Sequence, residues 1–234
     1  MAASPQEASE HPSTGRPEAP VGDRRVCFVL TVAFLLLPLV MLPGIEDFIL
    51  LPKLLLLQVL LVGLLGSALF TRKLRILALA THDWLLIAFF LILAASTFWA
   101  INPYRSTYDL AKHLTFLFFY LLIANNVGHS YLWPALTAHA ATGAFISCVG
   151  LLEYHGILPF AIPSTGRPSA FFGYRNLAAA YLACATPLAA TLIVAGKDPP
   201  HRLLGAVATS LMVVFLAYTR ARASWVGLTV GLGA

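Results

Sequence analysis

The segment RPSAFFGYRNLAAAYLACATPLAA, from Arg167 to Ala190, decides the fold, because its second half predicts a helix buried in a membrane. The apolar run continues to Ala195, and a helix needs about 20 mostly apolar residues to cross a bilayer. The first half places Arg167, Arg175 and Asn176 at the mouth of that helix. Polar groups at such a boundary either reach the lipid headgroups or hold an anion.

The composition of the whole chain indicates the same class of protein. Of its 234 residues, 59% are hydrophobic and 11% are charged, and the mean hydropathy is +0.81. Soluble domains are typically about 45–50% apolar and about 25% charged. The predicted fold class is therefore an all-α, polytopic integral membrane protein. The net charge of +5 comes from basic residues scattered over short loops, which argues against a nucleic-acid partner.

Eight apolar segments follow a polar amino-terminal stretch. Residues 1–25 are rich in Pro, Ser and Glu, which predicts a disordered cytoplasmic tail. Residues 26–234 form one predicted transmembrane domain of about seven to eight helices, with no visible internal repeat. The last segment is about half a span long, so we expect the chain to be truncated there. The predicted helices cover about 26–43, 49–70, 83–99, 109–125, 131–152, 176–195, 203–219 and 223–234.

Lysine and arginine residues in the loops set the expected orientation. Arg24 and Arg25 before the first helix, and TRKLR at residues 71–75, predict a cytoplasmic amino terminus. The opposite face then carries almost as many basic residues, against the usual bias, so something other than topology must favour them there. These outer residues are Lys53, Arg105, Lys112, Arg167, Arg175, Arg220 and Arg222.

The cysteines and histidines give no sign of a metal or redox centre. Cys27, Cys148 and Cys184 lie inside apolar runs, none of them belongs to a CxxC pair, and no histidine pair has metal-ligand spacing. We interpret the cysteines as small packing residues. The sequence accordingly predicts neither a metal nor a cofactor.

The segment AYTRARASWVGL, residues 217–228, sets Arg220 and Arg222 between two apolar helices. One interpretation is that both side chains extend to the headgroups. The other is an anion site, because guanidinium binds phosphate oxygens bidentately and a helix amino terminus follows directly. The segment GYRN offers the same choice. Asn176 is either only the N-cap of the next helix or also contacts phosphate beside Arg175.

Four short segments carry a family resemblance. LPKLLLLQVLL is similar to a second helix that opens with Pro-Lys or Thr-Lys, and FWAINPYRS to a W-s-i-n-P loop. RPSAFFGYRNLAAAYLACATPLA is similar to a pattern of arginine, Gly-x-x-Asn, small residues and Pro-Leu. TRARASWVGL is similar to T-g-S-R-g-a-W-l-g-L, with Thr219, Arg222 and Trp225 matching, Arg220 in place of glycine and Ala221 in place of serine. Over residues 26–234, these segments resemble the amino-terminal part of the O-antigen ligase and polymerase family of bacterial envelope glycosyltransferases.

The resemblance implies a metal-independent glycosyltransferase of the bacterial inner membrane. It implies a polyprenyl-diphosphate-linked oligosaccharide as donor, and a lipid, glycan or protein hydroxyl as acceptor. By residue match, Arg222 contacts the donor diphosphate, together with Arg175 and Asn176, and Arg220 and Arg167 complete the predicted site. The family's general base is a histidine in a long periplasmic loop, which would follow residue 234. We therefore assign no catalytic base and expect the chain alone to be inactive.

Two further classes of function stay open at this point. The first is a multi-helix transporter or lipid-carrier-binding protein without catalysis, and the second is a structural scaffold. Transporters typically show inverted repeats and charges near the middle of the membrane, whereas the charges here gather at one set of helix ends. A scaffold makes no use of the outer arginines.

Overall fold

The computed structural model describes residues 24–42, 47–71, 80–127, 131–164, 166, 168–196 and 198–233. Within these residues the regular structure is all helical, so the predicted all-α class is confirmed. Residues 1–23, with nearly all of the predicted tail, and residues 72–75 of the basic cluster lie outside the described residues. The elements are α1 (Arg24–Leu36), α2 (Leu50–Thr71), α3 (Thr81–Ser96), η1 (Thr97–Trp99), α4 (Pro103–Asn126), α5 (Leu132–Tyr154), η3 (Ala170–Phe172), α6 (Arg175–Ala195), α7 (Pro199–Thr219) and α8 (Arg222–Gly233).

Each predicted segment contains a helix, but three of the predicted boundaries are wrong, and proline explains all three. α1 ends at Leu36 rather than near residue 43, because Pro38 has no backbone N–H and disfavours helical geometry in the residue before it. α4 and α7 begin several residues early, at Pro103 and Pro199. Proline suits the first helical position, so a helix can start in a polar turn that a search for apolar runs omits.

The structure supports a helical membrane protein. Among the described helices, α5, α6 and α7 are long and apolar enough to cross a membrane, while the apolar stretches of α1, α2 and α3 are shorter. Val194 on α6 is 85% exposed and Leu203 on α7 is 67% exposed. Exposed apolar surface of this kind is typical of contact with lipid. The full set of seven to eight spans stays a prediction.

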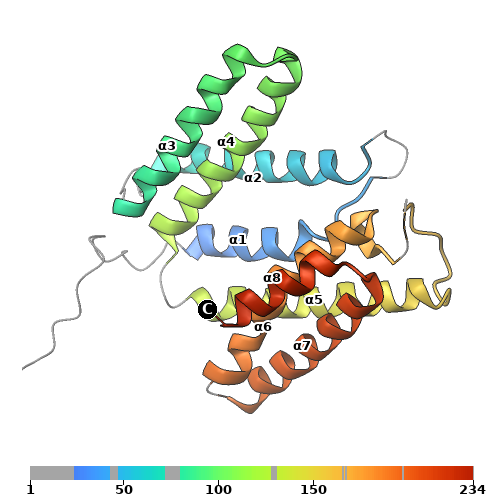
Figure 1. The fold of residues 1–234 in the computed structure, drawn as a ribbon. Helices are drawn as coiled ribbons and strands as arrows, with labels where there is room; N and C mark the ends of the chain where they lie inside the picture. Colours follow the sequence, from blue (N-terminus) through green and yellow to red (C-terminus); the bar gives the residue numbers. More distant parts are fainter. Residues whose placement is uncertain are drawn as a thin grey trace, which may run out of the picture. The chain divides into compact units, whose positions relative to one another are not determined.

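The chain separates into two compact units. The first contains α3, η1 and α4, and here α3 and α4 form a helical hairpin (Figure 1). The hydroxyl of Tyr120 on α4 donates a 2.9 Å hydrogen bond to the carboxylate of Asp83 on α3. The other oxygen of that buried carboxylate accepts the backbone N–H of Ala80 at 2.7 Å. Asp83 therefore both caps α3 and ties it to α4.

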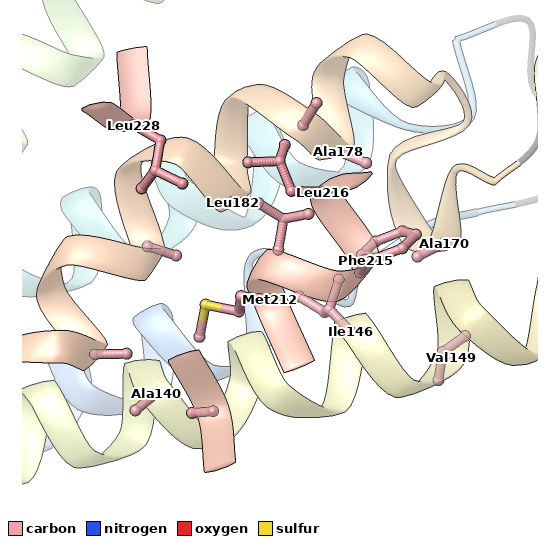
Figure 2. Close-up of a cluster of buried hydrophobic side chains, with 14 of the residues drawn as sticks. Ala140, Ile146, Val149, Ala170, Ala178, Leu182, Met212, Phe215, Leu216 and Leu228 are labelled. Atoms are coloured by element: carbon pink, nitrogen blue, oxygen red, sulfur yellow. The ribbon is translucent and has the colours of Figure 1, made fainter. Parts of the chain in front are cut away.

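The second unit contains α1, α2 and α5 to α8, and small residues let its central helices approach closely. A Cβ atom added to Gly150 on α5 would overlap the ring of Phe215 on α7, and one added to Gly205 on α7 would lie 2.8 Å from the Cβ of Leu192 on α6. Small residues at contacts are a common means of helix association in membranes. Figure 2 shows the resulting core, which includes Ala140, Ile146, Val149, Ala178, Leu182, Met212, Phe215, Leu216 and Leu228.

α8 packs along α6 with both helices running in the same direction. A Cβ added to Gly227 would lie 4.0 Å from the Cβ of Ala183, and one added to Gly231 would lie 3.4 Å from Cγ of Pro187. The second contact lies four residues after the first in each helix, as it must in a parallel pair. The amino termini of α6 and α8 therefore lie at the same end of the second unit (Figure 1).

Candidate functional site

Four helix ends gather at one end of the second unit, on the right of Figure 1. α5 and α7 end there, at Tyr154 and Thr219, and α6 and α8 begin there, at Arg175 and Arg222. The parallel contacts of α6 and α8 set Arg222 level with Ala178. Arg175 and Arg222 are therefore offset by less than one helical turn, about 4.5 Å along the axis. The structure thus places these two predicted residues at the same end of the second unit, on two contacting helices.

Arg175, Arg220 and Arg222 are exposed, and their side chains have no hydrogen bond or ion pair with any other described residue. The first turns of α6 and α8 contain no acidic residue. The amino terminus of a helix carries a partial positive charge and unpaired N–H groups, which favour an anion rather than a cation. Three uncompensated guanidinium groups at this position are suited to holding an anion.

The local structure corrects the interpretation of Asn176 as an N-cap. The N-cap of α6 is Tyr174, which is extended, and no side chain caps the helix. Asn176 is the second residue of α6 and is exposed. Because its side chain does not close the helix end, the amide is available beside Arg175. Whether it contacts phosphate stays a prediction.

Arg220 lies in the turn between α7 and α8 in a left-handed conformation, with φ +55°. Its backbone N–H bonds the carbonyl of Ala217 at 3.2 Å and closes α7. Residues with a side chain pay about 1–2 kcal/mol for this conformation, which glycine adopts freely. Glycine would therefore suit the backbone at position 220 better than arginine does. Glycine is also the residue that the T-g-S-R pattern has at this position. Arg167 lies outside the described residues.

Sequence reasoning missed the residues that hold the 169–173 turn, which precedes α6 and contains η3. Glu153, at the end of α5, accepts the backbone N–H groups of Ser169 at 2.9 Å and Ala170 at 2.7 Å, and it accepts the Ser169 hydroxyl at 3.3 Å. Glu153 is 5% exposed. The sequence did contain a sign of this role, because Glu153 is an acidic residue at the end of an apolar run, and such residues seldom lack a structural or functional role.

Lys53 holds the other side of the 169–173 turn. Its ammonium group donates 3.0 Å hydrogen bonds to the carbonyls of Pro38 and Phe171, and it lies 4.2 Å from the centre of the Phe172 ring. These contacts give Lys53 a reason to occupy its position that does not depend on membrane topology. The sequence placed it correctly in the first turns of its helix but gave no sign of this contact.

A small cavity also lies near this end of the second unit. A cavity of about 230 Å³ is lined by Glu153, Gly156 and residues 158–162. Within the described part of the chain, no three His, Cys, Asp or Glu residues group closely enough to hold a metal ion.

The chain matches no protein-family model, no curated protein and no solved structure. The resemblance to the O-antigen ligase and polymerase family therefore rests on the sequence segments quoted above.

Proposed function

We propose that the protein is a glycosyltransferase of the O-antigen ligase or polymerase type in the bacterial inner membrane. It takes a glycan from a polyprenyl-diphosphate-linked oligosaccharide and passes it to a lipid, glycan or protein hydroxyl. The amino terminus faces the cytoplasm, about seven to eight helices cross the membrane, and the reaction takes place at the periplasmic face. Arg222, Arg175, Asn176, Arg220 and Arg167 bind the donor diphosphate.

One observation carries the proposal. Arg175 and Arg222 begin two parallel, contacting helices at one end of the unit, and neither guanidinium group has a partner among the described residues. A diphosphate offers several oxygens to which guanidinium groups bind in pairs. The free N–H groups of α6 and α8 add to the same attraction. A lipid-linked donor also explains why such a site lies at a helix mouth rather than deep between the helices.

In the proposed transfer reaction, the role of these arginines is to stabilise the departing diphosphate. The bond between the anomeric carbon and the diphosphate oxygen breaks, and the acceptor oxygen takes that carbon while losing its proton. The departing diphosphate carries away the bonding electrons, so groups that stabilise negative charge on it lower the barrier. Guanidinium groups supply this stabilisation. The acceptor hydroxyl must also be held in line, which is a matter of positioning.

The proposal is tested by measuring the binding of geranylgeranyl diphosphate to the chain in nanodiscs, with geranylgeraniol as the phosphate-free comparison. Arg222→Ala and Arg222→Lys should both weaken binding about tenfold or more, because an ammonium group is a point charge and cannot form the bidentate contact. A residue that only anchors the helix at the headgroups would tolerate lysine. Full retention of affinity in Arg222→Lys would therefore remove the assigned role.

The matched control is Arg202→Ala. Arg202 belongs to the same unit but lies near the start of α7, at the opposite end, where its guanidinium donates to the carbonyl of Gly196 at 2.7 Å. This change should leave diphosphate affinity unaltered. A second assay, with a sugar on the diphosphate and a glycan acceptor, separates a transferase from a carrier-binding protein. Binding without transfer by the full-length protein in its natural membrane would favour the carrier-binding function.

A further inference from the structure

We propose that Lys53 and Glu153 form a clamp on the 169–173 turn, and that this clamp sets the direction in which Arg175 faces the diphosphate. Both are positioning residues, since neither is assigned a contact with the donor. The inference rests on the proposed function, because it concerns the same site. It adds two residues from α2 and α5 to a site whose arginines lie on α6 and α8.

The carboxylate side of the clamp is buried and fully engaged. Oε2 of Glu153 accepts the N–H groups of both Ser169 and Ala170, and Oε1 accepts the Ser169 hydroxyl. A buried carboxylate is costly unless hydrogen bonds replace its lost hydration. Here the turn supplies these bonds, and two consecutive backbone N–H groups, those of Ser169 and Ala170, donate to the same oxygen. The stability of the carboxylate and the geometry of the turn thus depend on each other.

The ammonium side holds the far end of the same turn. Lys53 donates to the carbonyl of Phe171 and also to that of Pro38, so it ties the turn to the segment after α1. The ring of Phe172 covers the ammonium group at a distance typical of a cation–π contact. The negative group thus meets the N–H end of η3, and the positive group meets its carbonyl end. This is the arrangement that the local backbone dipole favours.

The backbone between the two groups is strained, which indicates that something must hold it. Ala170 has φ +46° and Gly173 has φ +63°, and for a residue with a side chain such a conformation persists only where the surroundings enforce it. Ala170 is fully buried in the core of the unit (Figure 2). A Cβ added to Gly173 would overlap the side chain of Ile49, just before α2. The turn is therefore packed on both sides as well as hydrogen bonded.

The turn leads directly into the first turn of α6. Tyr174 follows Gly173, and its carbonyl accepts the N–H groups of Leu177 and Ala178 at 3.1 and 3.2 Å. Arg175 is the next residue, so its direction follows from the path of the chain through Gly173 and Tyr174. If the turn loosens, the amino terminus of α6 frays and Arg175 samples many directions. Binding must then restore the order, which lowers the apparent affinity.

Two measurements on the intact chain in nanodiscs test the clamp. The first is amide hydrogen exchange in peptides that cover residues 166–174, which reports the turn without any ligand. The second is the affinity for geranylgeranyl diphosphate. Lys53→Met removes the charge while keeping the length of the side chain, and Glu153→Gln removes one acceptor oxygen. Each change should speed exchange in the turn and weaken binding roughly 10- to 100-fold, although both leave every arginine in place.

Two controls separate positioning from general loosening. Lys53→Arg keeps a cation that can donate to both carbonyls, so it should recover most of the lost affinity. Gly205→Ala destabilises the unit near the start of α7, at the end opposite the turn, because its Cβ would lie 2.8 Å from the Cβ of Leu192. It should therefore not speed exchange in the turn before global unfolding. A lysine that only stabilises the unit as a whole would not give faster exchange confined to the turn.

Each outcome decides something different. Faster exchange together with weaker binding supports the clamp as a positioning device. Faster exchange with unchanged affinity overturns the link to Arg175, and unchanged exchange in both variants overturns the clamp itself. If the wild-type chain does not bind the diphosphate, the proposed function fails and the positioning role fails with it. The exchange data then still show whether the clamp holds the turn, so the two failures can be told apart.

Discussion

Gly150→Ala should destabilise the second unit, because α7 packs against α5 at this glycine with no room for a Cβ atom. An added Cβ would overlap three atoms of the Phe215 ring, and Phe215 is fully buried, so the ring cannot swing away. Forcing one extra carbon into a packed core typically costs about 1–3 kcal/mol. Replacing glycine by alanine inside a helix recovers about 1 kcal/mol of backbone preference. The net change expected is a loss of about 0–2 kcal/mol.

Two other glycines make this a graded series. A Cβ added to Gly63 on α2 would meet nothing within 4 Å, so Gly63→Ala should gain only the helix preference. A Cβ added to Gly143 on α5 would overlap the end of the Met212 side chain, which is flexible enough to move aside. The cost should therefore rise in the order Gly63, Gly143, Gly150, and the first and last should differ by about 1–3 kcal/mol.

The assay is reversible unfolding in mixed micelles, followed by tryptophan fluorescence as the denaturing detergent increases. A double-mutant cycle adds the decisive step, since Phe215→Leu removes the ring atoms that the new methyl group would strike. In that background, Gly150→Ala should cost at least about 1 kcal/mol less than in the wild-type chain. Equal stability of Gly150→Ala and Gly63→Ala, within about 0.5 kcal/mol, would contradict the close approach of α5 and α7.

Three further predictions concern other parts of the chain. Arg220→Gly should raise stability by about 1 kcal/mol in thermal unfolding, by relieving the left-handed strain, and should weaken diphosphate binding; stronger binding would exclude Arg220 from the site. In a chain without native cysteines, a cysteine at Ser164 should react with an impermeant reagent from the periplasm and one at Thr71 only from the cytoplasm; the reverse pattern would invert the proposed orientation. Tyr120→Phe removes a donor to the buried carboxylate of Asp83 and should lower the stability of the α3–α4 hairpin by about 1.5–3 kcal/mol, which thermal unfolding would detect.

The helices could be predicted from the sequence because lipid-facing segments need apolar side chains almost throughout their length. Apolar runs therefore marked the body of α2, α5 and α6 within a few residues. Boundaries failed where a helix extends beyond its apolar run, as at Pro103 and Pro199. There the first turn is polar and starts at proline, so the helix begins before the apolar segment that would enter the membrane.

The candidate site could likewise be predicted only in part from the sequence. Arg175 and Arg222 stand out in sequence because charges next to apolar runs are rare. Their proximity did not follow from the sequence, since it depends on the parallel packing of α6 and α8 through Gly227 and Gly231. The clamp was even harder to predict from the sequence, because Lys53 and Phe171 are far apart in the chain and come into contact only in the folded structure. Local chemistry can be read from residues, but pairing between distant segments requires the packed structure.

The placement of the arginines is itself an argument for an anionic ligand. α5 and α7 also end at this site, and a helix carboxyl terminus favours a cation. Arg220, just after α7, has that benefit, but Arg175 and Arg222 begin helices, where the local field opposes their charge. A role limited to anchoring at the headgroups gives no reason for this opposition, because arginines at the two carboxyl ends would anchor equally well. A diphosphate bound between α6 and α8 removes the conflict, since it attracts both guanidinium groups and is itself favoured by both helix ends.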